Sequence, residues 1–184
     1  MNVSKTPLPD VLAVENKVFS DSRGNFAEAW NKKRFEDAGI ATNFVQDNYS
    51  LSRRGVLRGM HFQSPFPQVK LVSVLRGGVF DVVVDLRRQS STFRKWWGTE
   101  LTEENGKQIY IPAGFAHGFL VTREDTIFLY KCSEFYHPEA EQSLLWNDPA
   151  IGIQWPIESP ILSSKDAAAQ TLSQWLQKPE SKNF

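Results

Sequence analysis

The feature that most constrains the fold is a series of short β-rich runs in the middle of the chain. They follow one another from residue 43 to residue 137 at roughly ten-residue spacing, and turn signals rich in Gly, Pro and Asn separate them. Helical periodicity is absent from this stretch. Many short strands joined by such turns are typical of an antiparallel sandwich or barrel. The pattern therefore predicts an all-β fold, a double-sheet jelly roll.

Helical signals occur only near the two ends of the chain. The stretch NKKRFEDAG, residues 31–39, predicts a brief helix with Asn31 as its cap and Gly39 as its stop. The stretch SSKDAAAQTLSQWLQK, residues 163–178, predicts one C-terminal helix. It would dock through an apolar stripe that consists of Leu172, Trp175 and Leu176.

The length fits one domain with a substantial core. We expect a single domain over residues 1–184, with a double-stranded β-helix core at about 16–160 and a helical segment at about 161–178. Within the core, the run VFDVVVDLR places Phe80, Val82 and Val84 on one face. The other face carries Asp81, Val83 and Asp85, and its charge suits the lining of a cavity.

The balance of positive and negative residues limits the kinds of molecule that the protein is expected to bind. Lys+Arg and Asp+Glu both number 21, which argues against a broad nucleic-acid or membrane-surface footprint. A small anionic ligand needs only a few local cations, so it stays possible. No apolar run is long enough to span a membrane, and the first residues lack a signal-peptide core. The lone Cys132 cannot form an intramolecular disulfide, so we expect a reducing compartment, the cytoplasm.

Two of the three histidines lie in runs that otherwise read as buried strands. His61 lies in GVLRGMHFQ and His117 in IYIPAGFAHGFLV. The segment PAGFAH fits P-x-G-x-x-H, a motif of cupin jelly rolls, whose metal-dependent members also carry H-x-H. Here Phe62 and Gln63 follow His61, and the remaining histidine, His137, lies far along the chain. We therefore expect no bound metal.

A histidine without a metal can act as a general base, because its ordinary pKa of about 6.5 is close to neutral pH. A core histidine that is hydrogen-bonded to the backbone is the alternative for either residue taken alone.

The order of several segments resembles the dTDP-4-dehydrorhamnose 3,5-epimerase family over residues of about 10–168. The segments are DSRGNFAEAW, FVQDNYSLSRRGVLRGMHFQ, QVKLVSVLRGGVFDVVVDLRRQSSTFRKWWG, IPAGFAHGFL, FLYKCSEFYHPEAEQSLLWNDPAIGIQWP and PILSSKDA. The resemblance implies a homodimer that epimerises a nucleotide-linked sugar, dTDP-4-keto-6-deoxyglucose, without metal or organic cofactor. A proton next to the ketone would leave, and a proton would return from the opposite face.

The resemblance also implies catalytic roles. His61 would be the base, and Asp166 would orient its imidazole. Tyr130 would be the acid on the opposite face, and Lys70 would stabilise the enolate oxygen with His117 nearby.

Each of these residues also has a plain structural interpretation. Lys70 could be a solvated surface residue, and Tyr130 could be an aromatic residue of a strand with its hydroxyl at the rim. Ser163-x-x-Asp166 before an Ala-rich stretch fits a capping box, which would account for the carboxylate without catalysis.

Further positions would bind the substrate by the same resemblance. Arg23 and Arg58 would bind the diphosphate, and Tyr136 would stack on the thymine ring. For Arg23, just before Gly24, a solvated turn is the alternative. The other polar positions, for which ordinary turn and edge polarity is the alternative, are Glu28, Gln46, Asp47 and Asn48. Glu141 and Lys165 are further binding positions.

The expected reaction is inversion of carbons 3 and 5 of dTDP-4-dehydro-6-deoxy-D-glucose to dTDP-4-dehydro-L-rhamnose, for dTDP-L-rhamnose biosynthesis. One alternative is a mono-epimerase that inverts a single carbon of a related nucleotide-linked sugar. Two others are a metal-dependent cupin enzyme, which the missing H-x-H opposes, and a non-catalytic sugar-binding jelly roll, which would bind without proton exchange.

Overall fold

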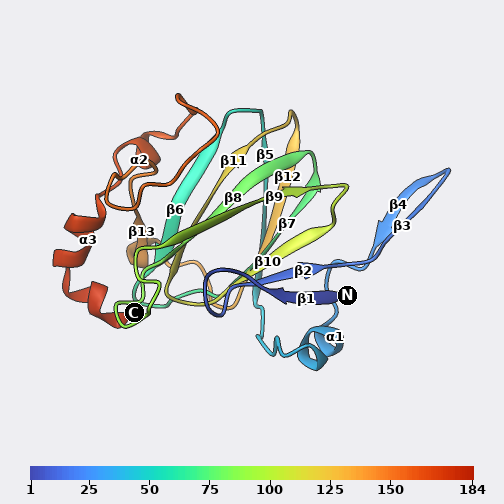
Figure 1. The fold of residues 1–184 in the computed structure, drawn as a ribbon, viewed down its shortest axis with the longest axis horizontal. Coiled ribbons are helices and arrows are strands. Elements are labelled where there is room, and N and C mark those ends of the chain that lie inside the picture. Colours follow the sequence, from blue (N-terminus) through green and yellow to red (C-terminus); the bar gives the residue numbers. More distant parts are fainter.

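Two stacked antiparallel sheets form the body of the molecule in the computed structural model, which describes residues 1–184 (Figure 1). The larger sheet has, in spatial order, the strands β1 (Asn2–Lys5), β2 (Leu12–Glu15), β10 (Lys107–Ile111), β7 (Lys70–Arg76), β12 (Thr126–Cys132) and β5 (Gln46–Ser52). The smaller sheet has the strands β13 (Glu141–Ser143), β6 (Leu57–Gln63), β11 (Phe115–Val121), β8 (Gly78–Asp85) and β9 (Trp96–Thr102). A separate hairpin consists of β3 (Val18–Asp21) and β4 (Gly24–Ala27).

The predicted jelly roll is confirmed, and every β-rich run between residues 43 and 137 contains a strand. The strands β1, β2, β3 and β13 were not expected. β13 has only three residues, all polar, and it is held by pairing with β6 rather than by an apolar pattern of its own. Short strands of this kind depend on tertiary pairing, which a sequence pattern does not report.

Apolar side chains from both sheets fill the space between them. Val72 and Phe128 come from the larger sheet, and Val83 and Phe119 come from the smaller one. The rings of Phe119 and Phe128 stack with their centroids 4.0 Å apart. Full burial of such side chains stabilises the fold by about 1.5–3 kcal/mol each, so this cluster joins the two sheets.

The C-terminal segment packs on the outer face of the smaller sheet, beside β13 and β6 (Figure 1). It consists of two short helices, α2 (Ser164–Ala167) and α3 (Leu172–Gln177), followed by the 3₁₀ turn η2 (Pro179–Asn183). Trp175 is fully buried and meets the Phe62 ring edge-on at 4.8 Å. Another 3₁₀ turn, η1 (Pro138–Ala140), precedes β13.

The prediction of one continuous helix over 163–178 was wrong. The chain leaves the helical path at Gln170, whose carbonyl accepts the Leu145 N–H at 2.8 Å. Thr171 and Gln174 then form a complete capping box that starts α3. The docking stripe itself is confirmed for Leu172 and Trp175, which are buried.

The predicted helix near the N-terminus is confirmed as α1 (Lys32–Asp37). The Asn31 side chain accepts the Arg34 N–H, which caps the first turn. Gly39 has a φ of 87°, the left-handed conformation that commonly ends a helix.

The three residues on the charged face of β8, which are Asp81, Val83 and Asp85, lie in three different surroundings. Val83 belongs to the core between the sheets, and Asp85 is fully buried away from any cavity, bonded to Arg87, Ser90 and Thr92. Only Asp81 takes part in the site described below. The expectation that this whole face lines a cavity was therefore wrong.

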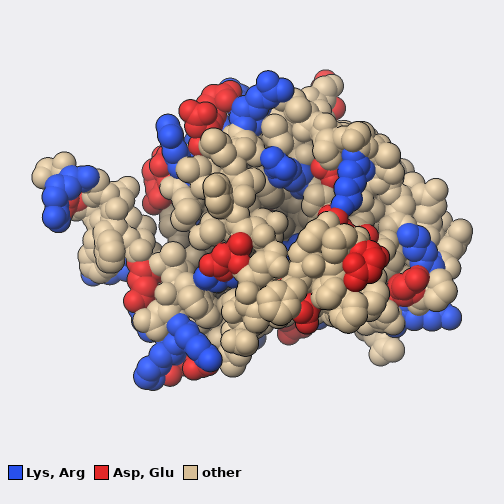
Figure 2. Space-filling model, turned by 180° about the vertical axis from the view of Figure 1, so that it is seen from behind, with Lys and Arg blue, Asp and Glu red and all other residues tan.

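Surface charge is mixed in sign. On the face in Figure 2, Lys and Arg lie among Asp and Glu instead of gathering into one patch. None of the helices has the length and apolar character needed to cross a bilayer.

Two glycines allow β6 and β11 to approach closely beside both strand histidines. A Cβ on Gly118 would lie 2.9 Å from the Arg58 carbonyl oxygen and 2.6 Å from the Met60 sulfur. Gly59 has a φ of 128° and faces the Gly118 backbone. The register of the pair shifts at this point, between His117 and Phe119. Glycine is required here because the neighbouring atoms are mostly backbone and cannot move aside.

We predict that Gly118→Ala lowers the free energy of unfolding by about 3 kcal/mol, because the added methyl group overpacks a backbone contact. Urea denaturation measures this loss. Gly24→Ala is the matched control, since Gly24 has a φ of 126° but open space around its Cβ position; we expect about 1 kcal/mol there. Equal losses in the two variants would contradict the argument from close approach.

Candidate active site

A cavity opens between the two sheets. It has two adjoining hollows of about 270 and 320 Å³, a size that suits a small-molecule ligand. The residues that line both hollows are His61, Lys70, Tyr130, Tyr136 and Glu141. His61 and Glu141 come from the smaller sheet, whereas Lys70 and Tyr130 come from the larger sheet. Groups from opposite sheets therefore face one space.

His61 is joined to Asp166 of α2. The His61 Nε2 atom lies 2.6 Å from Asp166 Oδ1, and the carboxylate side chain is only 5% exposed. Burial alone would raise the pKa of Asp166, but hydrogen bonds from His61 and Ser163 outweigh that effect and hold the pKa below its usual range. The charged carboxylate accepts the Nε2–H, so the lone pair of Nδ1 remains free on the imidazole.

Lys70 and Tyr130 lie next to each other on paired strands. The Lys70 Nζ atom is 5.9 Å from the centre of the Tyr130 ring. Burial lowers the pKa of Lys70 and raises the pKa of Tyr130. Both directions favour the uncharged side chain, because a low-dielectric surrounding disfavours charge. Lys70 is half-buried in the wall of the cavity, which contradicts its interpretation as a solvated surface residue.

His117 lines the hollow of about 320 Å³, called the deeper hollow from here on, and is paired with a second carboxylate. Its Nε2 atom lies 2.8 Å from Asp81 Oδ2, and the two side chains are 7% and 1% exposed. The ring also stacks near Phe128, with centroids 5.9 Å apart. The other oxygen of Asp81, Oδ1, is buried and has no hydrogen-bond partner.

A second cluster of polar groups lies at Glu141. Its carboxylate accepts the Tyr136 hydroxyl at 2.6 Å and forms an ion pair with Lys165. Burial alone would raise the pKa of Glu141, but these two hydrogen bonds hold it below its usual range. The hydrogen bond to Glu141 also raises the pKa of Tyr136.

Alternation along β5 separates the predicted polar residues. Gln46 and Asn48 line the cavity and are hydrogen-bonded to each other at 3.0 Å. Asp47, between them, points to the opposite face and is bonded to Lys131 at 2.8 Å. Arg58 also lines the deeper hollow, and its guanidinium donates to Ser52 at 3.1 Å.

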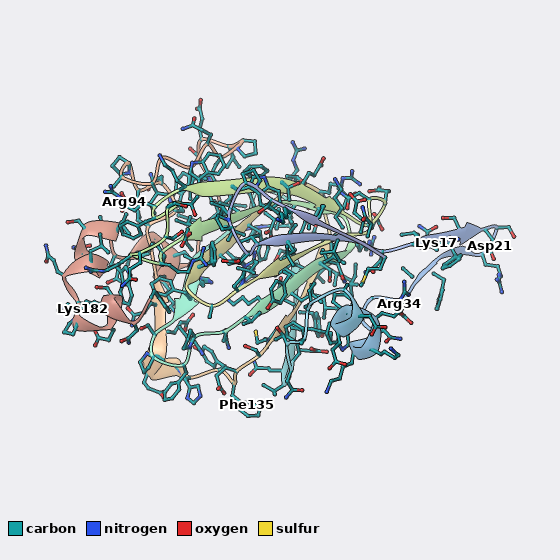
Figure 3. The ribbon with its side chains drawn as sticks, turned by 60° about the horizontal axis from the view of Figure 1, so that its bottom comes forward. Lys17, Asp21, Arg34, Arg94, Phe135 and Lys182 are labelled. Atoms are coloured by element: carbon teal, nitrogen blue, oxygen red, sulfur yellow. The ribbon has the colours of Figure 1, made fainter.

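Besides Asp47, two more predicted binding residues, Arg23 and Glu28, do not reach this cavity within one chain. Arg23 lies in the turn of the hairpin that projects from the body, where its side chain is 87% exposed and bonded only to Asp21 (Figures 1 and 3). Glu28 follows β4 and is bonded to Asn31 and Arg34 of the α1 region. Figure 3 labels Asp21 on the hairpin and Arg34 on α1, both on the side opposite Lys182.

Some site residues were not identified from the sequence. Asp81 was expected on a face that lines a cavity, but its pairing with His117 was not expected, although a carboxylate in a strand that is otherwise buried needs a polar partner. Cys132 lines the cavity and accepts a weak hydrogen bond from Asn48 at 3.8 Å. Gln63 and Gln68 brace the segment before Tyr136 by donating to the Phe135 carbonyl, at 3.2 and 3.4 Å. Nothing in the sequence marks these contacts.

The arrangement suits proton transfer at a carbon atom. It provides an imidazole with a free nitrogen on one sheet and a phenol and an amine on the opposite sheet. No group of three or more His, Cys, Asp or Glu side chains is placed to hold a metal ion.

Comparison with known proteins identifies relatives over nearly the whole chain. The family model of dTDP-4-dehydrorhamnose 3,5-epimerase matches residues 5–174. The dTDP-4-dehydrorhamnose 3,5-epimerase of Salmonella typhimurium is 52% identical over 179 residues, which are 96% of this chain and 98% of the relative.

Solved structures agree with this match. A dTDP-6-deoxy-D-glucose-3,5-epimerase from Legionella pneumophila, crystallised with dTDP-4-keto-L-rhamnose, has a TM-score of 0.92 and 48% identity, covering 98% of this chain and 96% of its own. A 3'-monoepimerase from Streptomyces bikiniensis, in complex with dTDP-quinovose, has a TM-score of 0.87 and 34% identity, covering 94% and 88%.

We predict that Lys70 titrates at a lower pH than the other lysines, because burial disfavours its ammonium form. The measurement is a ¹³C NMR titration of the protein after reductive methylation of its lysines. The early-titrating signal should disappear in Lys70→Gln and stay in Lys33→Gln, a change at an exposed lysine of α1. A single common titration for all lysines would contradict the burial of Lys70.

Proposed function

The chain belongs to the dTDP-4-dehydrorhamnose 3,5-epimerase family, and we propose that it inverts carbons 3 and 5 of dTDP-4-dehydro-6-deoxy-D-glucose in dTDP-L-rhamnose biosynthesis. The observation that carries the proposal is the His61–Asp166 pair facing Lys70 and Tyr130 across one cavity. This set supplies a base and an acid on opposite sides of a bound sugar.

The ketone at carbon 4 makes the protons on carbons 3 and 5 acidic. His61 would remove such a proton through Nδ1, because Asp166 occupies Nε2. The imidazolium that forms is stabilised by the buried carboxylate of Asp166. A histidine of this kind typically contributes 10²–10⁴-fold to a proton transfer.

Loss of the proton leaves an enolate, whose oxygen carries negative charge. The Lys70 side chain would donate a hydrogen bond to this oxygen, and the negative charge of the enolate would in turn favour its ammonium form, with His117 nearby in the same hollow. The charge interaction is stronger than in water, because the surrounding strands keep the effective dielectric low.

Tyr130 would return the proton from the opposite face. Burial raises its pKa, so the phenol keeps its proton at neutral pH and can donate it. Inversion follows when a carbon loses its proton to His61 on one side and gains one from Tyr130 on the other. Carbons 3 and 5 flank the same carbonyl, so one set of groups serves both, once His61 has released its proton to solvent and Tyr130 has taken one up.

The remaining predicted residues would hold the nucleotide and the sugar. Arg58 suits a phosphate, and the exposed ring of Tyr136 suits stacking on a base. The other candidates are Gln46, Asn48 and Glu141 at the cavity, Lys165 beside it through its ion pair with Glu141, and Asp47 on the outer face of β5. The proposal includes a cytoplasmic location, with Cys132 reduced and buried.

A mono-epimerase is the second candidate function, since such an enzyme shares the fold. The double epimerase is favoured because relatives of that kind are 52% identical, against 34% for the 3'-monoepimerase.

The homodimer is part of the proposal. Arg23 and Glu28 would serve the cavity of a second copy, which the exposed hairpin would reach. Phe19 and Phe26 on the hairpin are 52% and 71% exposed, more than an isolated chain would favour for aromatic rings. β5 is an edge strand with an exposed Tyr49 and Leu51, so a second copy would cover both features.

We predict that the protein incorporates solvent deuterium at carbons 3 and 5 of dTDP-4-keto-6-deoxyglucose, which proton NMR in deuterated water measures while a reductase traps the product. His61→Ala and Asp166→Asn should lower the exchange roughly 10³-fold or more, because base and partner act as one unit. Tyr130→Phe should slow completed inversion more than the first exchange.

Asp37→Asn, at the exposed end of α1, is the control for Asp166→Asn and should exchange normally. Label at one carbon alone would identify a mono-epimerase. Near-normal turnover in His61→Ala would refute the mechanism.

We predict that the protein is a dimer in solution, with twice the chain mass of 21.0 kDa. We also predict that Arg23→Ala raises the KM for the substrate. Mixing His61→Ala chains with Arg23→Ala chains should restore activity at low substrate to about a quarter of the wild type, since half of the dimers are mixed and each has one complete site. A monomeric mass by light scattering, or no restoration, would refute the shared site.

A further inference from the structure

The Asp166 carboxylate is held from two sides. Its Oδ1 atom lies 2.6 Å from His61 Nε2, and its Oδ2 atom accepts the Ser163 hydroxyl at 2.8 Å. The same hydroxyl oxygen accepts the Asp166 backbone N–H at 3.0 Å, which caps α2. Ser163 therefore contacts Asp166 twice, once at the backbone and once at the side chain.

The direction of the Ser163 hydroxyl is determined by these partners. A hydroxyl has one proton, a backbone N–H can only donate, and an ionised carboxylate can only accept. The Ser163 O–H must therefore point at Asp166 Oδ2. A hydrogen bond to a charged acceptor is stronger than a neutral one, and it restricts rotation of the carboxylate.

Comparison of the two short helices shows what is unusual at α2. At α3, Thr171 and Gln174 form a capping box in which each side chain bonds the other's backbone. At α2 only the serine half is formed, because the Asp166 side chain turns to His61 and to the Ser163 hydroxyl. The Asp166 carboxylate, which would complete the capping box by accepting the Ser163 backbone N–H, is instead bonded to the His61 imidazole.

From this geometry we propose that Ser163 is a positioning residue of the reaction: its hydroxyl aims the Asp166 carboxylate at His61 and keeps the pair ready to accept a proton. The inference rests on the proposed function, since it concerns the same base. Without the hydroxyl the carboxylate keeps only its bonds to His61 and to the Gly59 backbone, so it rotates more freely and orients the imidazole less well. The hydrogen bond from Ser163 also helps to hold the pKa of Asp166 down, so its loss makes the pair bind protons more tightly.

Other charged and titratable groups face the pair from every neighbouring strand. They are Glu141 of β13, Arg58 of β6, Lys70 of β7, Tyr130 and Cys132 of β12, His117 of β11, Tyr136 before η1, and Lys165 of α2 through its ion pair with Glu141. These groups are unchanged when only Ser163 is altered, so a change in pH dependence is attributable to the hydroxyl. Ser163 itself is exposed, which makes it a mild site for substitution.

The test compares Ser163→Gly, Ser163→Thr and Thr171→Gly with the wild type. Glycine is a good N-cap, so Ser163→Gly removes the hydroxyl with little effect on the start of α2. Thr171→Gly makes the corresponding change at α3, away from the site. Each variant is assayed for solvent deuterium exchange as a function of pH, with kcat and KM determined separately.

We expect Ser163→Gly to lower kcat roughly ten- to a hundredfold with KM nearly unchanged. The acid limb of its pH profile should move up by about one pH unit, because the pair retains its proton to higher pH. Ser163→Thr should restore both kcat and the acid limb, since threonine has a hydroxyl at the same position. Thr171→Gly should behave as the wild type.

If Ser163→Gly has the kcat and the acid limb of the wild type, the inference is overturned. It is also overturned if Ser163→Gly and Thr171→Gly lose equal amounts of kcat and both keep the wild-type pH profile. Absence of exchange in the wild type would refute the proposed function instead. In that case ¹⁵N NMR of the His61 ring still tests the inference: the pH at which the pair takes up its proton should rise in Ser163→Gly, and an unchanged value would refute it.

Discussion

The site depends on one physical constraint: a buried carboxylate needs partners. Asp166 and Asp81 are 5% and 1% exposed, and each is bonded to a histidine. Leaving either charge unpaired in so little water would cost several kcal/mol. The bond between Asp166 and His61 holds α2 against β6, and the bond between Asp81 and His117 adds a side-chain contact between the paired strands β8 and β11. The two histidines that suggested chemistry in the sequence are therefore held by carboxylates that come from distant parts of the chain.

The two sheets divide the proposed chemistry between them. The smaller sheet presents His61 with its carboxylate, and the larger sheet presents Lys70 and Tyr130. Because stacked sheets lie about 10 Å apart, a sugar ring fits between groups that belong to opposite layers. The cluster around Phe119 and Phe128 sets that spacing, so the apolar core also determines the distance across which protons would move.

Much of the fold was predictable from the sequence, because strand alternation and turn residues are local signals. The split of the C-terminal helix was not, since Gln170 is diverted by a backbone bond to Leu145 across 25 positions of sequence. Asp47 was grouped with Gln46 and Asn48 by motif, yet strand alternation sends its side chain to the other face. Pairs such as His117–Asp81 lie beyond local patterns altogether, because they form only when two strands meet.

The bridge at Gln170 has a mechanical consequence for the chain end. Terminal turns of a protein fray readily, and fraying that starts at residue 184 would travel along a continuous helix to Asp166. Here the backbone is fastened at Gln170, and α3 begins again with its own cap. Motion of the last turn is thus isolated from the carboxylate beside His61. Because the helix is interrupted and the backbone is bonded at Gln170, the end of the chain can unfold locally without moving His61.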